Sequence, residues 1–182
     1  MISTKFDLAL FLEKDKQALG RKKKWPSPFD DIWIFEIALR HHEYYTNICG
    51  GVISHCKRIF WSFLHYHYGV RLGFEIPVNV FDYGLRINHR GTIIVNAKTR
   101  IGKWCDIHAC VNIGEGLDRQ APHIGDNCWI GPGAKLFGGI TIGDGVMIGA
   151  GAVVNRSFGN QVRIAGVPAK VVKEEGEPYH RK

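Results

Sequence analysis

Aliphatic residues recur at every sixth position through the C-terminal half of the chain. They form one series at Val95, Ile101, Ile107 and Ile113, and a second at Ile124, Ile130, Leu136, Ile142, Ile148 and Val154. A strict period of six fits neither an α-helix, with about 3.6 residues per turn, nor a long strand, with a period of about two. It predicts a solenoid in which each hexapeptide forms one short strand and a turn, and three hexapeptides complete a triangular coil.

The residues before the repeat are expected to be helical. The three predicted helices are the segment that ends at Gly20, residues 31–47 and residues 52–68, with a proline-containing linker at 25–28. Asp30 or Asp31 is expected to cap the second helix. The chain therefore divides into an N-terminal α-helical region (1–70), a β-helix domain (71–173) and a C-terminal tail (174–182). The helices are expected to cover the open edge of the solenoid.

The run IGDNCWIGPGAKLFGGITIGDGVMIGAGAVV, followed by IAGVPAKVV, resembles the left-handed β-helix acyltransferases. Among them it is most similar to the serine acetyltransferases and their relatives in polysaccharide biosynthesis. The resemblance covers roughly residues 70–173. It implies a mainly β fold, a left-handed parallel β-helix of hexapeptide repeats. It also implies a homotrimer with active sites between subunits, and acetyl-CoA as co-substrate, with no metal.

Charge and cysteine content add two expectations. The formal net charge is +7, and the basic run Arg21-Lys22-Lys23-Lys24 is either a solvated loop or an attraction for an anionic partner. No nucleic-acid recognition motif accompanies this charge. The five cysteines form no CxxC pair, and neither a secretory signal nor a transmembrane segment is evident. We therefore expect reduced thiols and a cytoplasmic protein.

His89 is the best candidate for a general base. It lies one hexad step before Val95, where an aliphatic residue is expected. The segment 85–92 is similar to the catalytic segment of the family, in which an aspartate precedes the histidine. The alternative is a histidine that merely ends a strand. Asn88 stands where the serine enzymes have an acid, and this favours an acceptor without an ammonium group.

Glu75 is the candidate to orient His89. It lies 14 residues earlier, and a coil of three hexads spans about 18 residues, so it is expected near the same edge one coil below. A carboxylate there would fix the tautomer and stabilise the imidazolium. The alternative is a solvated glutamate. Asp82 is the reserve for this role, and we also count it as a candidate substrate-binding residue.

The interval between Ile113 and Ile124 is five residues longer than one hexad step, so a protruding loop is expected there. The family has a substrate-binding histidine in this loop, and His123 either replaces it or only decorates the loop. The resemblance also implies acetyl-CoA contacts at Gly114, Pro132 and Ala150, where small residues admit the pantetheine arm. Lys170 matches a basic position near the nucleotide; its alternative is an ordinary exposed lysine.

These observations predict an O-acetyltransferase. The short helical region, Asn88 and the altered loop favour a sugar hydroxyl in capsular or exopolysaccharide biosynthesis as acceptor, with serine O-acetylation for cysteine biosynthesis as the alternative. A zinc-dependent protein of the γ-carbonic anhydrase kind is more distant; its ligands would be His89, His108 and His123, which are 19 and 15 residues apart. A noncatalytic scaffold is the last alternative.

Overall fold

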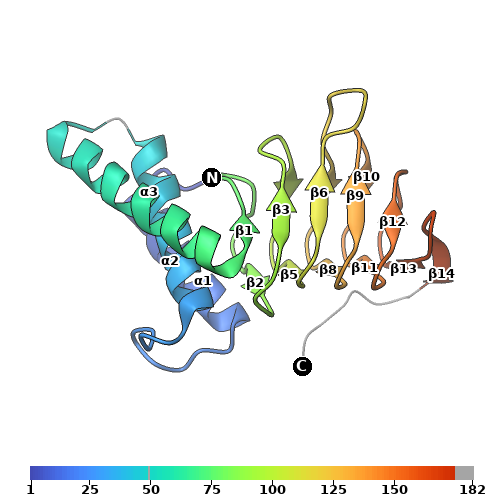
Figure 1. Ribbon diagram of the computed structural model, residues 1–182, viewed down its shortest axis with the longest axis horizontal. Coiled ribbons are helices and arrows are strands. Elements are labelled where there is room, and N and C mark those ends of the chain that lie inside the picture. Colours follow the sequence, from blue (N-terminus) through green and yellow to red (C-terminus); the bar gives the residue numbers. More distant parts are fainter. Residues whose placement is uncertain (49, 175–182) are drawn as a thin grey trace.

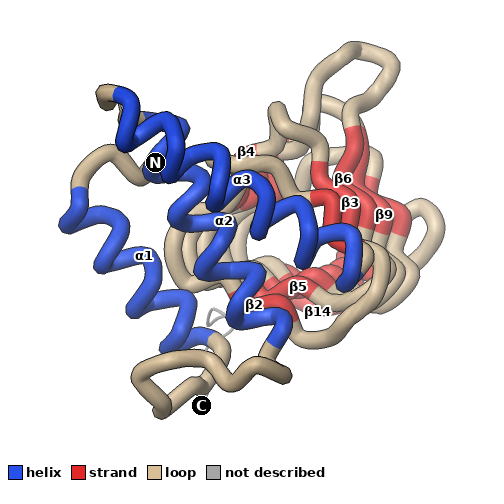
Figure 2. Tube along the Cα trace, turned by 60° about the vertical axis from the view of Figure 1, so that its left-hand side comes forward, coloured by secondary structure: helices blue, strands red, loops and turns tan. Residues whose placement is uncertain are grey.

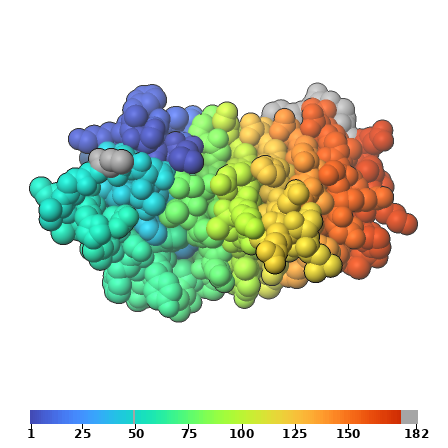
Figure 3. All heavy atoms as spheres, turned by 90° about the horizontal axis from the view of Figure 1, so that it is seen from above, coloured from blue at the N-terminus to red at the C-terminus, as the bar shows by residue number. Residues whose placement is uncertain are grey.

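The computed structural model describes residues 1–48 and 50–174. Three helices pack at one end, and a solenoid of short strands continues from them along the long axis (Figure 1). The space-filling view shows the chain progressing along this axis from the helices to the last coils (Figure 3). The predicted tail, apart from Glu174, and Cys49 lie outside the described residues.

Each helix has local signals at its ends. α1 (Lys5–Ala18) begins with a capping box between Thr4 and Asp7. α2 (Asp31–Asn47) has the predicted bounds, and its N-cap is Asp30, although the Asp30 side chain makes no capping hydrogen bond. That carboxylate instead pairs with Arg21, with 2.8 Å between Oδ2 and Nε. α3 (Val52–Leu72) runs four residues past its predicted end and stops at Gly73, which has a φ of 81°.

Fourteen short strands build three sheets. The first sheet contains β1 (Phe74–Glu75), β3 (Ile93–Val95), β6 (Asn112–Gly114), β9 (Lys135–Phe137) and β12 (Val153–Val154). The second contains β4 (Arg100–Ile101), β7 (His123–Ile124) and β10 (Thr141–Ile142). The third contains β2 (Arg86–Ile87), β5 (Asp106–Ile107), β8 (Trp129–Ile130), β11 (Met147–Ile148), β13 (Val162–Ala165) and β14 (Lys170–Glu174).

The hexad aliphatics fill the interior of the solenoid. Ile107, Ile130 and Ile148 are in register in adjacent parallel strands, and each is at most 1% exposed. The sheets surround this core, as the view turned by 60° shows (Figure 2). The structure confirms the predicted mainly β solenoid with parallel sheets and N-terminal helices. The exception is β14, which pairs antiparallel with β13.

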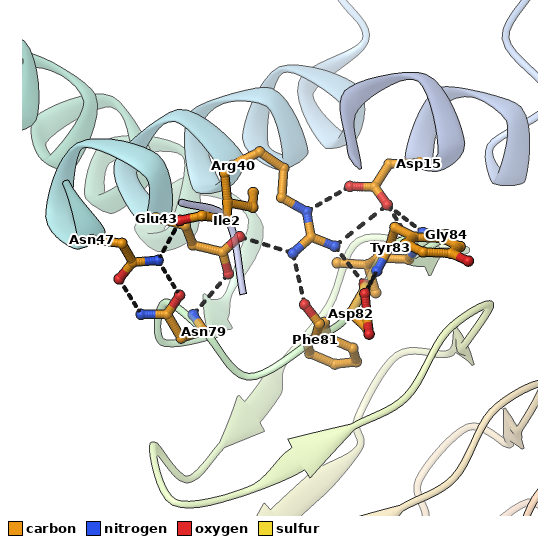
Figure 4. A network of polar contacts seen from close by, with 11 residues as sticks. Ile2, Asp15, Arg40, Glu43, Asn47, Asn79, Phe81, Asp82, Tyr83 and Gly84 are labelled. Atoms are coloured by element: carbon orange, nitrogen blue, oxygen red, sulfur yellow. Dashed lines mark hydrogen bonds and ion pairs between the residues drawn. The ribbon is translucent and has the colours of Figure 1, made fainter. Parts of the chain in front are cut away.

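A buried polar network joins the helices to the first coil. The guanidinium of Arg40 in α2 donates to Asp15, Glu43 and the carbonyl oxygens of Phe81 and Asp82 (Figure 4). All donors of a buried guanidinium need acceptors, and here both side chains and backbone supply them. The network therefore fixes the helical region against the start of the solenoid.

Two further findings concern thiols and membranes. Cys56 and Cys110 are exposed, Cys105 and Cys128 are buried, and all four are free. Burial raises the pKa of the Cys128 thiol to about 12. Within the described residues, none of the helices combines the length and apolar character needed to span a bilayer.

Candidate active site

One edge of the solenoid carries His89. Ile87, Ile107, Ile130 and Ile148 are in register on successive coils, so the residues two positions after each lie along one edge: His89, Ala109, Pro132 and Ala150. Two hydrogen bonds link neighbouring coils here, from Gly133 N to Ala109 O (3.0 Å) and from Gly151 N to Pro132 O (2.9 Å). The predicted base and two predicted acetyl-CoA contacts therefore share one edge, which we call the His89 edge.

The His89 side chain is exposed on a bend after β2. Its nearest aromatic neighbour is His108, one coil further on, with 6.1 Å between ring centroids and 52° between ring planes. An exposed imidazole at a coil edge is accessible to a substrate and has room to exchange a proton. His89 is thus placed where a general base needs to be.

Glu75 does not pair with His89 in this chain. It lies in β1 and is in register with Ile94, five residues beyond His89, on a different sheet from β2. No hydrogen bond or ion pair joins the two side chains among the described residues. Glu75 instead lines a pocket of about 640 Å³ between α3 and the first coil, together with Tyr66 and Thr92. Its role in orienting His89 stays a prediction without a contact to support it.

A polar cluster next to His89 was not predicted from the sequence. Asn88 donates through Nδ2 to Asp106 Oδ1, and the same nitrogen lies 3.1 Å from His108 Nε2. Arg86 forms an ion pair with Asp106, with 3.0 Å between Nη1 and Oδ2. These four residues come from β2, β5 and the positions just after those strands. Only the alternation of outward-facing positions in the repeat hinted at them.

Burial controls the charge of this cluster. Asp106 is 5% exposed, and burial raises the pKa of its carboxyl group, whereas the positive charge of Arg86 acts in the opposite direction. Burial also lowers the pKa of His108; Asp106 opposes this effect, and His89 and Arg86 add to it. His108 is therefore biased toward the neutral imidazole.

The other predicted site residues lie away from the His89 edge. Asp82 and His123 line a pocket of about 510 Å³ along the sheet of β4, β7 and β10, beside the helical region. The Asp82 carboxylate accepts a hydrogen bond from Tyr83 N at 2.7 Å. Gly114 ends β6, and Lys170 is the exposed first residue of β14. The structure thus brings Asp82 and His123 together, but at a different face from His89.

The three histidines of the zinc alternative do not converge within this chain. His89 and His108 are neighbours, whereas His123 lies in β7 on another sheet. In the described part of the chain, no group of three or more histidine, cysteine, aspartate or glutamate side chains is arranged to hold a metal ion. The geometry of this chain gives the zinc alternative no support.

Comparison with known proteins agrees with the repeat. Residues 121–156 match the family model "Bacterial transferase hexapeptide (six repeats)". The chain is 31% identical over 129 residues to the serine acetyltransferase of Synechococcus elongatus, a match that covers 69% of this chain and 48% of that protein. It is 32% identical over 151 residues to the serine acetyltransferase of Staphylococcus xylosus, covering 80% of this chain and 64% of that protein.

The fold agrees as well. The crystal structure of a serine acetyltransferase from Brucella abortus strain S19 is similar with a TM-score of 0.71 and 25% identity, over 92% of this chain and 69% of that one. The chain spans about half to two thirds of the length of the two relatives in sequence. It belongs to the hexapeptide-repeat acyltransferases with a parallel β-helix, and it resembles the serine acetyltransferases among them.

Proposed function

We propose that the protein is an acetyl-CoA-dependent O-acetyltransferase with His89 as general base. The observation that carries the proposal is the placement of His89 on the same edge as Pro132 and Ala150, in a chain whose relatives are serine acetyltransferases. Small residues along that edge let a pantetheine arm approach the backbone. His89 then lies at the end of the row, beside the thioester.

The proposed reaction is a single acyl transfer. His89 removes the proton of the acceptor hydroxyl as its oxygen attacks the thioester carbonyl carbon. The tetrahedral intermediate collapses with cleavage of the carbon–sulfur bond, and the His89 imidazolium returns its proton to the leaving thiolate. The products are an acetyl ester and free coenzyme A. Substrate held against the coil edge makes the attack effectively intramolecular.

For the acceptor we propose L-serine, because both relatives compared in sequence are named serine acetyltransferases. This replaces the sugar preference of the sequence analysis, which the comparisons do not support. Asn88 was the main argument against serine, since it is uncharged. However, the Asp106 carboxylate lies against the Asn88 amide, so a carboxylate is present near the position where the serine enzymes have an acid.

A sugar hydroxyl is the second candidate, and one observation favours it. Asp106 is already paired with Arg86 and is 5% exposed, so it is poorly placed to bind an ammonium group from solvent. Asn88 and His108 offer uncharged hydrogen-bonding groups, which suit a neutral acceptor. The homotrimer, the cytoplasmic location and the roles of Glu75, Asp82, His123, Gly114 and Lys170 remain predictions within this proposal.

The test measures thiol release from acetyl-CoA with L-serine and, separately, with a panel of sugars and nucleotide-sugars. Each acetylated product is identified by mass spectrometry. Turnover with L-serine supports the proposal, and turnover with a sugar alone moves the acceptor to the second candidate. No turnover with any of these acceptors, from folded protein that binds coenzyme A, contradicts both.

A further inference from the structure

The nearest imidazole to His89 belongs to His108, whose ring is held in place from two directions. Asn88 contacts its Nε2 at 3.1 Å, and Trp129 packs against the ring edge to face, with 4.8 Å between centroids. The side chain keeps 18% of its surface exposed. Among the described residues, its other ring nitrogen, Nδ1, has no hydrogen-bond partner. The ring is therefore fixed and keeps one nitrogen for a ligand.

The contact with Asn88 assigns the position of the proton on this ring. An amide nitrogen only donates, so Nε2 of His108 accepts and the proton of the neutral ring lies on Nδ1. Asp106 does not reverse this assignment, because its Oδ1 is 3.6 Å from His108 Nε2, beyond hydrogen-bond distance. The Asn88 amide already occupies that carboxylate oxygen.

The charges around the ring favour the same neutral state. Asp106 is the negative group that faces His108, and Arg86 and His89 are the positive or potentially positive groups. Because Arg86 pairs with Asp106, the carboxylate is largely compensated. A neutral imidazole that donates through Nδ1 suits an oxygen that acquires negative charge during a reaction.

Position along the solenoid indicates which oxygen that is. His108 immediately precedes Ala109, which lies between His89 and Pro132 on the His89 edge. An acetyl-pantetheine arm that runs past Ala150 and Pro132 toward His89 passes His108 just before it reaches the base. The thioester carbonyl therefore comes next to His108. A separation of 6.1 Å between the two imidazole centroids leaves space for a reacting group between them.

We propose that His108 is a second catalytic residue, which donates a hydrogen bond from Nδ1 to the thioester carbonyl oxygen as it becomes the oxyanion. The inference rests on the proposed function. As the acceptor oxygen attacks and His89 takes its proton, the carbonyl electron pair moves onto the oxygen that faces His108. On collapse the pair returns, the carbon–sulfur bond breaks, and His108 keeps its proton throughout. Asn88 and Asp106 are positioning residues that act through His108.

The activity test compares His108→Leu with His108→Gln, in which a side-chain N–H donor is retained. Loss of one oxyanion donor typically lowers kcat by about 10²- to 10³-fold. We expect such a loss in His108→Leu with the KM for acetyl-CoA within about threefold, and partial recovery in His108→Gln. The control is His67→Leu on α3, which removes a histidine far along the chain from the site. Equal kcat values for wild type and His108→Leu would overturn the inference while leaving the proposed acyl transfer intact.

A second measurement needs no activity. In ¹⁵N-histidine NMR spectra the Nδ1–H and Nε2–H tautomers are distinguishable, and His108→Gln assigns the resonance. We expect the Nδ1–H tautomer in wild type and a shift toward the Nε2–H or doubly protonated ring in Asn88→Asp, because a carboxylate at this position only accepts. An Nε2–H tautomer in wild type would overturn the inference, whichever acceptor the enzyme uses.

Discussion

Arg40 of α2 and Asp15 of α1 form a buried ion pair, with 2.6 Å between Nε and Oδ2 and at most 3% of either side chain exposed. Asp15 Oδ1 also accepts hydrogen bonds from the backbone N–H groups of Gly84 and Leu85, in the first coil. One carboxylate thus joins two helices and the solenoid. Because Asn88 and His89 follow Leu85 closely, the pair also holds the start of the proposed active site.

Arg40→Leu is expected to destabilise the protein strongly. Removal of the guanidinium leaves the buried carboxylates of Asp15 and Glu43 without their cation, and breaking such a pair costs about 3 to 5 kcal/mol. The free energy of unfolding from denaturant titration measures this loss. Arg21→Leu is the matched control, because Arg21 pairs with Asp30 at a similar 2.8 Å but is 40% exposed, and exposed pairs contribute roughly 0 to 1 kcal/mol. Equal losses in the two variants would contradict the role given to the buried network.

Glu36 gives the same region a pH dependence. It is 1% exposed, its Oε2 has no hydrogen-bond partner among the described residues, and Oε1 accepts only a long hydrogen bond from Ile87 N, at 3.3 Å. Burial, reinforced by the negative charge of Asp15, raises the pKa of Glu36 well above its usual 4.5, and Arg40 opposes this. Above pH 4.5 the unfolded chain therefore loses this proton while the folded protein keeps it. Stability falls as the pH rises until the folded-state pKa is passed.

Glu36→Gln removes this ionisation and keeps the acceptor for Ile87. We expect the variant to gain stability relative to wild type as the pH rises from 5 to 8, with little difference near pH 4. Thermal unfolding across this range measures the effect. A difference between the two proteins that is constant with pH would show that Glu36 ionises normally in the folded state. Glu13→Gln, at an exposed position on α1, is the control.

Gly131 lies where successive coils approach most closely on the His89 edge. A Cβ at this position would lie 2.6 Å from the carbonyl oxygen of Ile148 and 2.8 Å from the nitrogen of Ala150. Gly131→Ala must therefore displace backbone, at a cost of about 1 to 3 kcal/mol. Because the displaced coil carries Pro132 and Ala150, we expect a raised KM for acetyl-CoA as well as a lower melting temperature. Gly159→Ala is the control, since a Cβ there meets no atom within 4 Å; a wild-type KM in Gly131→Ala would remove this edge from the proposed acetyl-CoA site.

The repeat could be predicted because every hexad obeys the same local rule. An inward aliphatic followed by a turn is a short-range pattern, so the strands around Ile107, Ile130 and Ile148 follow directly from the sequence. α2 could be predicted for a similar reason, since the linker before it and Gly50-Gly51 after it are local signals. The Arg40 network could not, because its partners are up to 42 residues away and meet only in the folded chain.

The candidate site shows where counting residues fails. Glu75 was expected near His89 on the basis of an 18-residue coil, but the first coil is longer, and Glu75 is in register with Ile94, 19 residues later. For the same reason Arg86 aligns with Asp106, 20 residues later. A shift of one or two residues decides which side chains meet on an edge. The cluster of Asn88, Asp106 and His108 therefore became visible only from the register of the strands.

The most direct test of the account is the rate of thiol release from acetyl-CoA by wild type and His89→Ala, with the acceptor that wild type uses. Loss of a general base typically lowers the rate by about 10²- to 10⁴-fold. We predict a fall in kcat of this size in His89→Ala, with unchanged coenzyme A binding and an unchanged melting temperature, because the side chain is exposed. A His89→Ala variant that transfers acetyl groups at the wild-type rate would contradict the central claim.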